Sequence, residues 1–130
     1  MTGLTRAALV AAASAAALGL AAPASAAITV ETFLAKVAGL KAKGPLALFS
    51  GDIGLLKRES AAAITGMAAE KKARAAAGRP PLHCAPDKAK MTASEMIAGL
   101  QSIPPHERRI TLQDGFTRVI AKKYPCSRAG

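Results

Sequence analysis

The chain has 130 residues, a length that suits one small domain. It carries 18 lysine and arginine residues against 8 aspartate and glutamate residues, which gives a formal net charge of +10 at pH 7. Because it has three phenylalanines, one tyrosine and no tryptophan, few side chains could stack on bases, and the composition argues against nucleic acid as a partner.

The chain begins with the features of a secretory signal peptide. Arg6 supplies a positive charge, an uncharged apolar stretch follows, and residues 24–26 (ASA) offer a small-x-small cleavage site. A membrane-spanning helix is the alternative, but the stretch is short, rich in alanine and followed by Pro23, whereas a span needs about 20 strongly apolar residues. We therefore predict a signal peptide over residues 1–26 and an exported mature domain, residues 27–130, that is periplasmic or secreted and has no membrane span.

The first element of the mature chain is predicted to be a helix that ends at Lys43 to Pro45, where the sequence KGP stops it. Its apolar residues recur at the i, i+3, i+4, i+7 spacing of one helical face: Val30, Phe33, Leu34, Val37 and Leu40. Residues 45–51 (PLALFSG) then form a short apolar turn.

A second helix is predicted from about Ile53 to Gly78, which is a natural C-cap. Its apolar positions are Ile53, Leu56, Ile64 and Met67, and its alanine-rich, charged end is expected to be exposed to solvent. Residues 79–86 (RPPLHCAP) contain Pro80 and Pro81, so the helix cannot continue across them and a loop follows.

Two further helices are predicted in the C-terminal half. The first begins at Thr92 to Glu95, which fits a capping box, and ends at Pro104. The second begins at Thr111 and ends before Pro125. Their apolar faces comprise Met96, Ile97, Leu100 and Ile103, then Leu112, Phe116, Val119 and Ile120. Since no strand-like alternation occurs, we expect an all-α domain, a small bundle of about four helices.

The two cysteines, Cys84 and Cys126, are predicted to form one disulfide. An oxidising compartment lets cysteines pair and stay paired, and two cysteines allow only one intramolecular connectivity. Closing a loop of about 42 residues should stabilise the fold by roughly 4 kcal/mol through the unfolded state. The bridge would clamp the last two helices, a helical hairpin, at their open end.

Two other roles for the cysteines are less well supported. His83 next to Cys84 suggests a catalytic thiol, but adjacent residues rarely aim a base at a nucleophile, and the signatures of cysteine nucleophiles are absent. A zinc site from His83, Cys84, His106 and Cys126 lacks C-x-x-C or H-x-x-x-H spacing. Both histidines lie in proline-flanked loops, and we expect them to have surface or structural roles.

The sequence holds none of the common catalytic motifs. There is no glycine-rich phosphate loop and no G-x-S-x-G serine elbow, and no two carboxylates have a spacing that suggests a catalytic pair. We therefore expect no catalytic residues, no cofactor and no metal, and a protein that is not an enzyme.

Residues 82–127 resemble a known family. They read LHCAP, then a helix ASEMIAGLQSIPP, then TLQDGFTRVIAKKYPC, which is similar to the C-terminal half of the Rap/Tai immunity proteins. Cys84-Ala85-Pro86 and Tyr124-Pro125-Cys126 are the matching positions. The resemblance covers less than half of the mature chain, and residues 27–83 lack the further cysteine that family members usually carry.

The resemblance implies a function in protein binding rather than catalysis. Rap/Tai proteins neutralise peptidoglycan-cleaving amidase effectors that type VI secretion delivers, so a periplasmic protein partner of that kind is expected. The alternatives are a periplasmic acid-stress chaperone similar to the HdeA-type proteins, or a basic envelope protein of unknown role. Without its signal peptide the chain has a net charge of +9, which could steer it toward an acidic partner or anionic envelope polymers.

Overall fold

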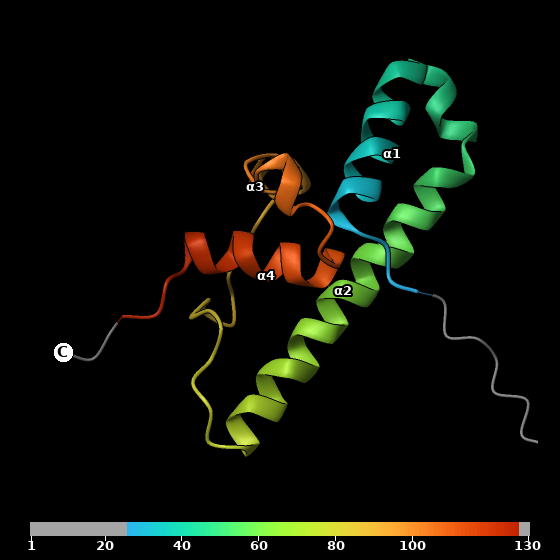
Figure 1. The fold of residues 1–130 in the computed structure, drawn as a ribbon. Coiled ribbons are helices and arrows are strands. Elements are labelled where there is room, and N and C mark those ends of the chain that lie inside the picture. Colours follow the sequence, from blue (N-terminus) through green and yellow to red (C-terminus); the bar gives the residue numbers. More distant parts are fainter. Residues whose placement is uncertain (1–25, 128–130) are drawn as a thin grey trace, which may run out of the picture.

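Four α-helices and two short 3₁₀ helices make up the structure, a computed structural model that describes residues 26–127 (Figure 1). In chain order they are α1 (Val30–Lys43), η1 (Gly44–Phe49), α2 (Gly51–Ala76), α3 (Ala93–Gln101), η2 (Pro105–Glu107) and α4 (Leu112–Lys123). Within that part of the chain, the isolated bridge between Thr29 and Thr111 is the only β pairing. The all-α prediction is confirmed. The predicted signal peptide lies outside the described residues except for Ala26.

The helices begin where side chains can accept from exposed backbone donors. Thr29 accepts from the amide of Thr32 at the start of α1, and Ser50 accepts from the amide of Asp52 at the start of α2. Thr92 and Glu95 form the predicted capping box, with the Thr92 amide 2.7 Å from Glu95 Oε2. Because each cap satisfies donors that the helix itself cannot, these local signals fix the starts of the helices.

Glycines in the left-handed region end the first two helices. Gly44 has φ 55° and Gly78 has φ 66°, a conformation that costs a side-chain-free residue little. A short apolar turn is predicted over residues 45–51, and residues 44–49 form the 3₁₀ helix η1, which has Pro45 in its first turn. The predicted start of α2 was two residues late, because Ser50 caps the helix before the first apolar residue of the pattern.

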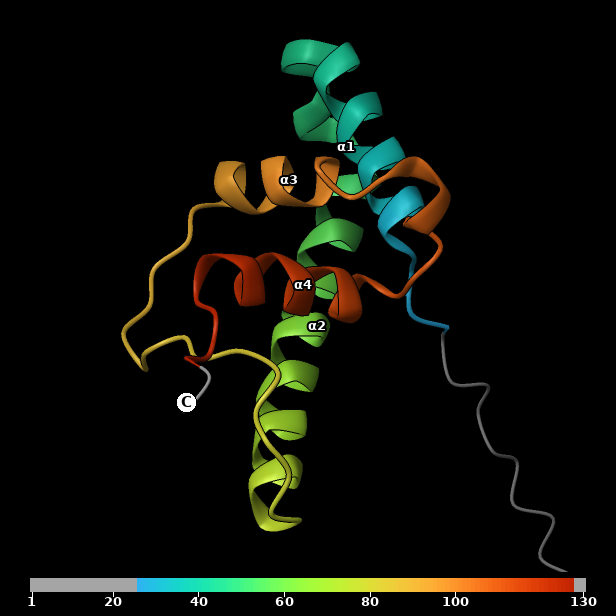
Figure 2. The same cartoon turned by 60° about the vertical axis from the view of Figure 1, so that its left-hand side comes forward.

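The core lies where α1 and α4 pack on α2 and where α3 packs on α1 and α4, and α4 crosses the middle of α2 (Figures 1 and 2). Its buried residues are Val30, Phe33, Val37, Leu56, Ala63, Met67, Leu100, Ile103, Leu112, Phe116 and Val119. Ile64 was predicted on the apolar face of α2, yet it is 59% exposed. The turn of α2 that contains Ile64 faces an open groove between helices, and no other described helix covers it.

A disulfide joins Cys84 and Cys126, whose Cα atoms are 4.9 Å apart. The backbone beside it is also paired, since the Cys84 amide donates to the Tyr124 carbonyl at 3.0 Å. The bond ties the connector ahead of α3 to the segment after α4. The predicted clamp on the C-terminal hairpin is therefore present in the structure.

Candidate functional site

The residues considered for catalysis or zinc are not assembled into a reactive site. The sulfur atoms of Cys84 and Cys126 are bonded to each other in the disulfide, so neither is a free thiol. His83 Nδ1 accepts from the Ala85 amide at 3.4 Å, while His106 lies on η2, with its Nε2 3.7 Å from Glu107 Oε1. Over residues 26–127, no group of three or more histidine, cysteine, aspartate or glutamate side chains could hold a metal ion.

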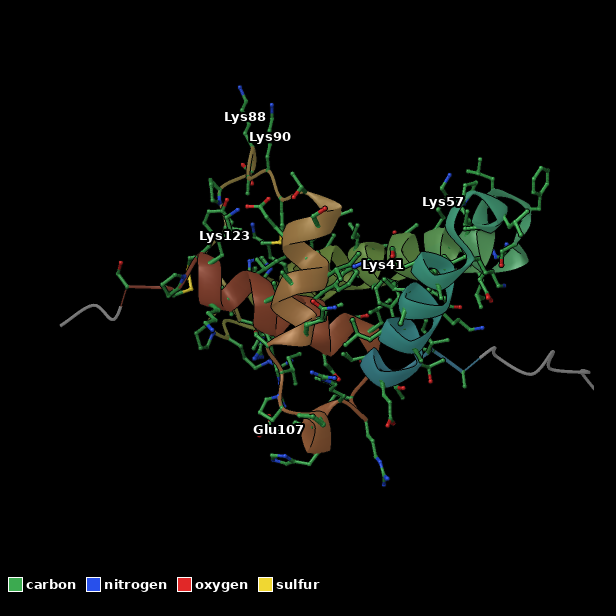
Figure 3. The ribbon with its side chains drawn as sticks, turned by 90° about the horizontal axis from the view of Figure 1, so that it is seen from above. Lys41, Lys57, Lys88, Lys90, Glu107 and Lys123 are labelled. Atoms are coloured by element: carbon green, nitrogen blue, oxygen red, sulfur yellow. A yellow bond between two sulfur atoms is a disulfide. The ribbon has the colours of Figure 1, made fainter. Side chains whose placement is uncertain are left out.

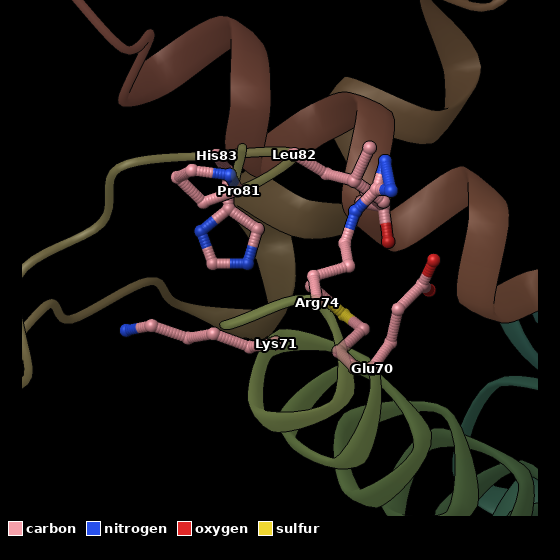
Figure 4. Close-up of a pocket in the computed structure, with 8 residues that line it drawn as sticks. Glu70, Lys71, Arg74, Pro81, Leu82 and His83 are labelled. Carbon is pink, nitrogen blue, oxygen red and sulfur yellow. The ribbon is translucent and has the colours of Figure 1, made fainter. Parts of the chain in front are cut away.

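His83 lies where the connector after α2 folds back on that helix (Figure 4). Pro81, Leu82 and His83 face Lys71 and Arg74 of α2 across a cavity of only about 10 Å³, which suits about one water molecule. Burial, together with the positive charge of Lys71, lowers the pKa of His83 below its usual value. The neutral imidazole therefore fits its role as a hydrogen-bond acceptor in the connector.

A wider site lies where α1, α2 and α3 meet. Two adjoining hollows of about 220 Å³ and about 520 Å³ open to solvent there, and both are lined by Phe33, Ser60, Ile64 and Ile97. We call their combined surface the apolar groove. Its other lining residues are Val37, Leu40, Lys41, Leu56, Lys57, Ala61, Met91, Thr92, Ala93, Met96 and Phe116.

Two buried aromatic rings form the floor of the apolar groove, and aliphatic and methionine side chains form its walls. Phe33 and Phe116 are buried and meet edge to face, with ring centroids 6.3 Å apart. Ile64 stands on one wall, and Met91 and Met96 belong to the α3 side. Methionine side chains adjust to irregular apolar surfaces, so the groove is suited to an apolar segment of a partner.

Positive charge lies along one end of the apolar groove. Lys41 of α1 and Lys57 of α2 line the larger hollow, and both are on the side of the α1–α2 hairpin (Figure 3). The same hairpin is tied by Lys36 Nζ, 2.9 Å from Asp52 Oδ1. That hydrogen bond and the lysine charge lower the pKa of the Asp52 carboxyl.

At the other end, an ion pair links the two helices of the C-terminal hairpin. Glu95 Oε1 lies 2.9 Å from Lys123 Nζ, and the backbone amide of Thr92 donates to the same carboxylate. These contacts, led by the Thr92 amide, hold the pKa of Glu95 at about 2, and the carboxylate in turn raises the pKa of Lys123. The pair is solvent-exposed and links α4 to the first turn of α3, which carries Met96 and Ile97.

Sequence reasoning missed the apolar groove because its residues come from all four α-helices, which only the assembled fold brings together. The available signal was Ile64, which interrupts an alanine-rich stretch of α2 that offers few large partners. A second signal was the pair of methionines at positions 91 and 96, which flank the capping box. Neither indicates a groove until the helices are placed side by side.

No protein-family model, no curated protein and no solved structure matches the chain. The likeness of residues 82–127 to the Rap/Tai proteins therefore stays a prediction. Between residues 26 and 127, no helix has the length and apolar character that crossing a membrane requires.

Proposed function

We propose that the protein is an exported, non-catalytic binding protein of the Rap/Tai immunity type, which neutralises a peptidoglycan amidase in the periplasm. The observation that carries the proposal is the apolar groove, an open surface to which all four α-helices contribute, with phenylalanines at its floor and lysines at one end. The Cys84–Cys126 disulfide is compatible with an oxidising compartment. The Rap/Tai-like pattern of the C-terminal half supplies the class of partner.

In this proposal the apolar groove provides the binding affinity, and the lysines increase the rate of association. An apolar anchor of the partner would pack against Ile64 and Ile97, where burial of apolar area favours binding. Lys41, at the groove end, would attract an acidic rim on the partner. Raising the salt concentration should then slow association more than it speeds dissociation.

The test combines gene deletion with a groove variant. Cells lacking the gene should lose survival among neighbours that deliver the amidase, and wild-type protein should restore it. Ile64→Glu places a charge in the groove at an exposed position, so we expect little change in folding and a loss of affinity of about tenfold or more.

Leu82→Glu is the matched control, because Leu82 is an exposed leucine of the connector that does not line the groove. It should protect as well as wild type does. If deletion leaves survival among armed neighbours unchanged, the immunity function is wrong. If Ile64→Glu protects fully, the groove is not the binding surface.

An acid-stress chaperone is the second candidate, and the ion pairs favour it. Lys36–Asp52 ties α1 to α2, Glu95–Lys123 ties α3 to α4, and the pKa of each carboxyl is lowered. The Glu95–Lys123 pair would be lost as the pH falls toward about 2, and protonation of Asp52 in acid would break the Lys36–Asp52 pair, which would loosen the walls of the groove. Loss of survival in acid, with unchanged survival among armed neighbours, would support this candidate and contradict the first.

A further inference from the structure

The tip of the α1–α2 hairpin exposes three large apolar side chains in a row of four residues. Leu46 is 70% exposed, Leu48 is 80% exposed and Phe49 is 88% exposed, and all three belong to η1. Single exposed apolar residues are common on protein surfaces, but a contiguous group of this size marks an interaction site. The tip is distinct from the apolar groove, whose lining includes none of the three.

Local backbone chemistry holds this tip away from the core. Gly44 and Pro45 end α1, and Ser50 caps α2, so the six residues of η1 must turn at the far end of the hairpin. Figures 1 and 2 show the hairpin projecting beyond α3 and α4, with no other described segment over its end. The exposure of Leu48 and Phe49 is therefore built into the fold.

The charges around the tip are nearly all of one sign. Between positions 36 and 58 the sequence has five basic residues and one acidic residue: Lys36, Lys41, Lys43, Lys57 and Arg58 against Asp52. The carboxylate of Asp52 is already paired with Lys36. The basic residues come from both helices, so positive charge flanks the apolar tip on two sides.

We propose that this tip docks on the surface of an anionic phospholipid bilayer. The three apolar side chains would enter the boundary between headgroups and acyl chains, while Lys41, Lys43 and Lys57 would lie among the negative headgroups. Apolar residues combined with flanking lysines are the pattern of interfacial membrane binding. A convex apolar tip with positive charge on two sides complements a surface that is negative all around the point of entry. The apolar side chains of the tip lie outside the groove, whereas Lys41 and Lys57 also line it, so the substitutions at Leu46 and Leu48 separate this proposal from amidase binding.

The protein's lack of tryptophan gives a direct readout. Phe49→Trp places one indole at the tip, and Leu82→Trp places one in the connector as a control. Each processed chain is mixed with vesicles of phosphatidylcholine containing 30% phosphatidylglycerol, or with vesicles of phosphatidylcholine alone. We expect a blue shift, and quenching by brominated acyl chains, for Phe49→Trp with the anionic vesicles and neither effect for Leu82→Trp.

Two matched pairs of charge substitutions test the role of the lysines, each in the Phe49→Trp background. Lys41→Gln with Lys43→Gln should lower the vesicle partition coefficient about 10- to 25-fold, at roughly fivefold for each lysine near the membrane surface. Lys88→Gln with Lys90→Gln removes the same charge from the connector, which lies away from the tip of the hairpin (Figure 3), and should change the partition coefficient less than about twofold. All variants carry the same N-terminus, so the differences report on the substituted residues.

Substitutions of the apolar side chains at the tip form the second part of the vesicle-binding test. Leu46→Ser with Leu48→Ser should lower partitioning about tenfold or more, with the helical circular dichroism signal unchanged. Absence of binding to anionic vesicles, equal effects of the two lysine pairs, or equal shifts at positions 49 and 82 would each overturn the proposal. A tip-dependent dimer in light scattering without vesicles would assign the tip to a second copy of the chain and would also overturn it.

Discussion

Two glycines set how closely α3 and α4 pack against their neighbours. A Cβ added at Gly99 would overlap the side chain of Val119, and one added at Gly115 would overlap Val30 Cγ2. Val30 is fully buried, so it has no space into which it could move. At these two positions the absence of a side chain is a packing requirement, whereas a Cβ added at Gly39 would meet no atom within 4 Å.

We predict opposite effects of alanine at two helical glycines. Gly115→Ala should lower the free energy of unfolding by about 1–3 kcal/mol, because the methyl group overpacks the core against Val30. Gly39→Ala should raise it by up to about 1 kcal/mol, since alanine favours the helix and the space is open. Urea unfolding of both variants measures the difference. A higher midpoint for Gly115→Ala than for Gly39→Ala would contradict the packing of α4.

The core assignments give a second prediction for single residues. Phe116→Ala and Leu100→Ala should each lower the free energy of unfolding by about 2–5 kcal/mol, because both side chains are buried. Lys72→Ala, at an exposed position on the end of α2, should cost under about 0.5 kcal/mol. Denaturation midpoints provide the test, and equal midpoints for Phe116→Ala and Lys72→Ala would mean that the buried faces are assigned wrongly.

Among the elements, local chemistry explains which features the sequence could predict. The start of α3 was predictable because Thr92 and Glu95 lie three residues apart and cap each other. The exposure of Ile64 was not predictable, because it depends on how far α3 lies from α2. A periodic pattern gives the face of a helix but not whether a neighbour covers every turn of that face.

The tip of the α1–α2 hairpin is a second case in which the sequence predicts a local structure but not its exposure to solvent. Residues 45–51 were recognisable as an apolar turn from Pro45 and Gly51. Whether their side chains fold onto the core or project from it depends on the length of α1 and α2 beyond the other helices. That length is a property of the assembled fold, so the sequence alone indicated a turn and not an exposed patch.

The ion pair between α3 and α4 predicts how the hairpin responds to acid. The pKa of Glu95 is about 2 in the folded protein and 4.5 ordinarily, so the unfolded chain binds its proton more readily. Its contribution to stability is therefore complete above about pH 4.5 and is lost as the pH falls toward about 2. Glu95→Gln should lower the urea midpoint at pH 7 and leave it unchanged at pH 2.

Asp87→Asn is the control for this titration. The Asp87 side chain is 98% exposed, and its only ion-pair partner among residues 26–127 is Lys71, at 3.9 Å. This variant should follow the wild-type midpoint at both pH values, because exposed pairs contribute little. A Glu95→Gln midpoint that differs from wild type equally at pH 7 and pH 2 would show that the carboxylate charge is not the cause.

For the whole molecule, the disulfide closes a loop that contains α3 and α4. We predict that Cys84→Ser with Cys126→Ser lowers the free energy of unfolding by roughly 4 kcal/mol, because the 42-residue separation no longer restricts the unfolded chain. Mass spectrometry of protein taken from its own compartment should find no thiol that reacts before reduction. Alkylation of both cysteines without a reductant would contradict both the clamp and the predicted export.

The central claim is that the apolar groove of the whole molecule binds a peptidoglycan amidase. The most direct measurement is photo-crosslinking in the producing cells under attack by amidase-armed neighbours, with p-benzoylphenylalanine introduced at Ile64 or, as a control, at Leu82. We predict one crosslinked product at position 64, of the mass of a one-to-one complex and identified as the amidase, and none at position 82. The same products at both positions, or no amidase at position 64, would contradict the claim.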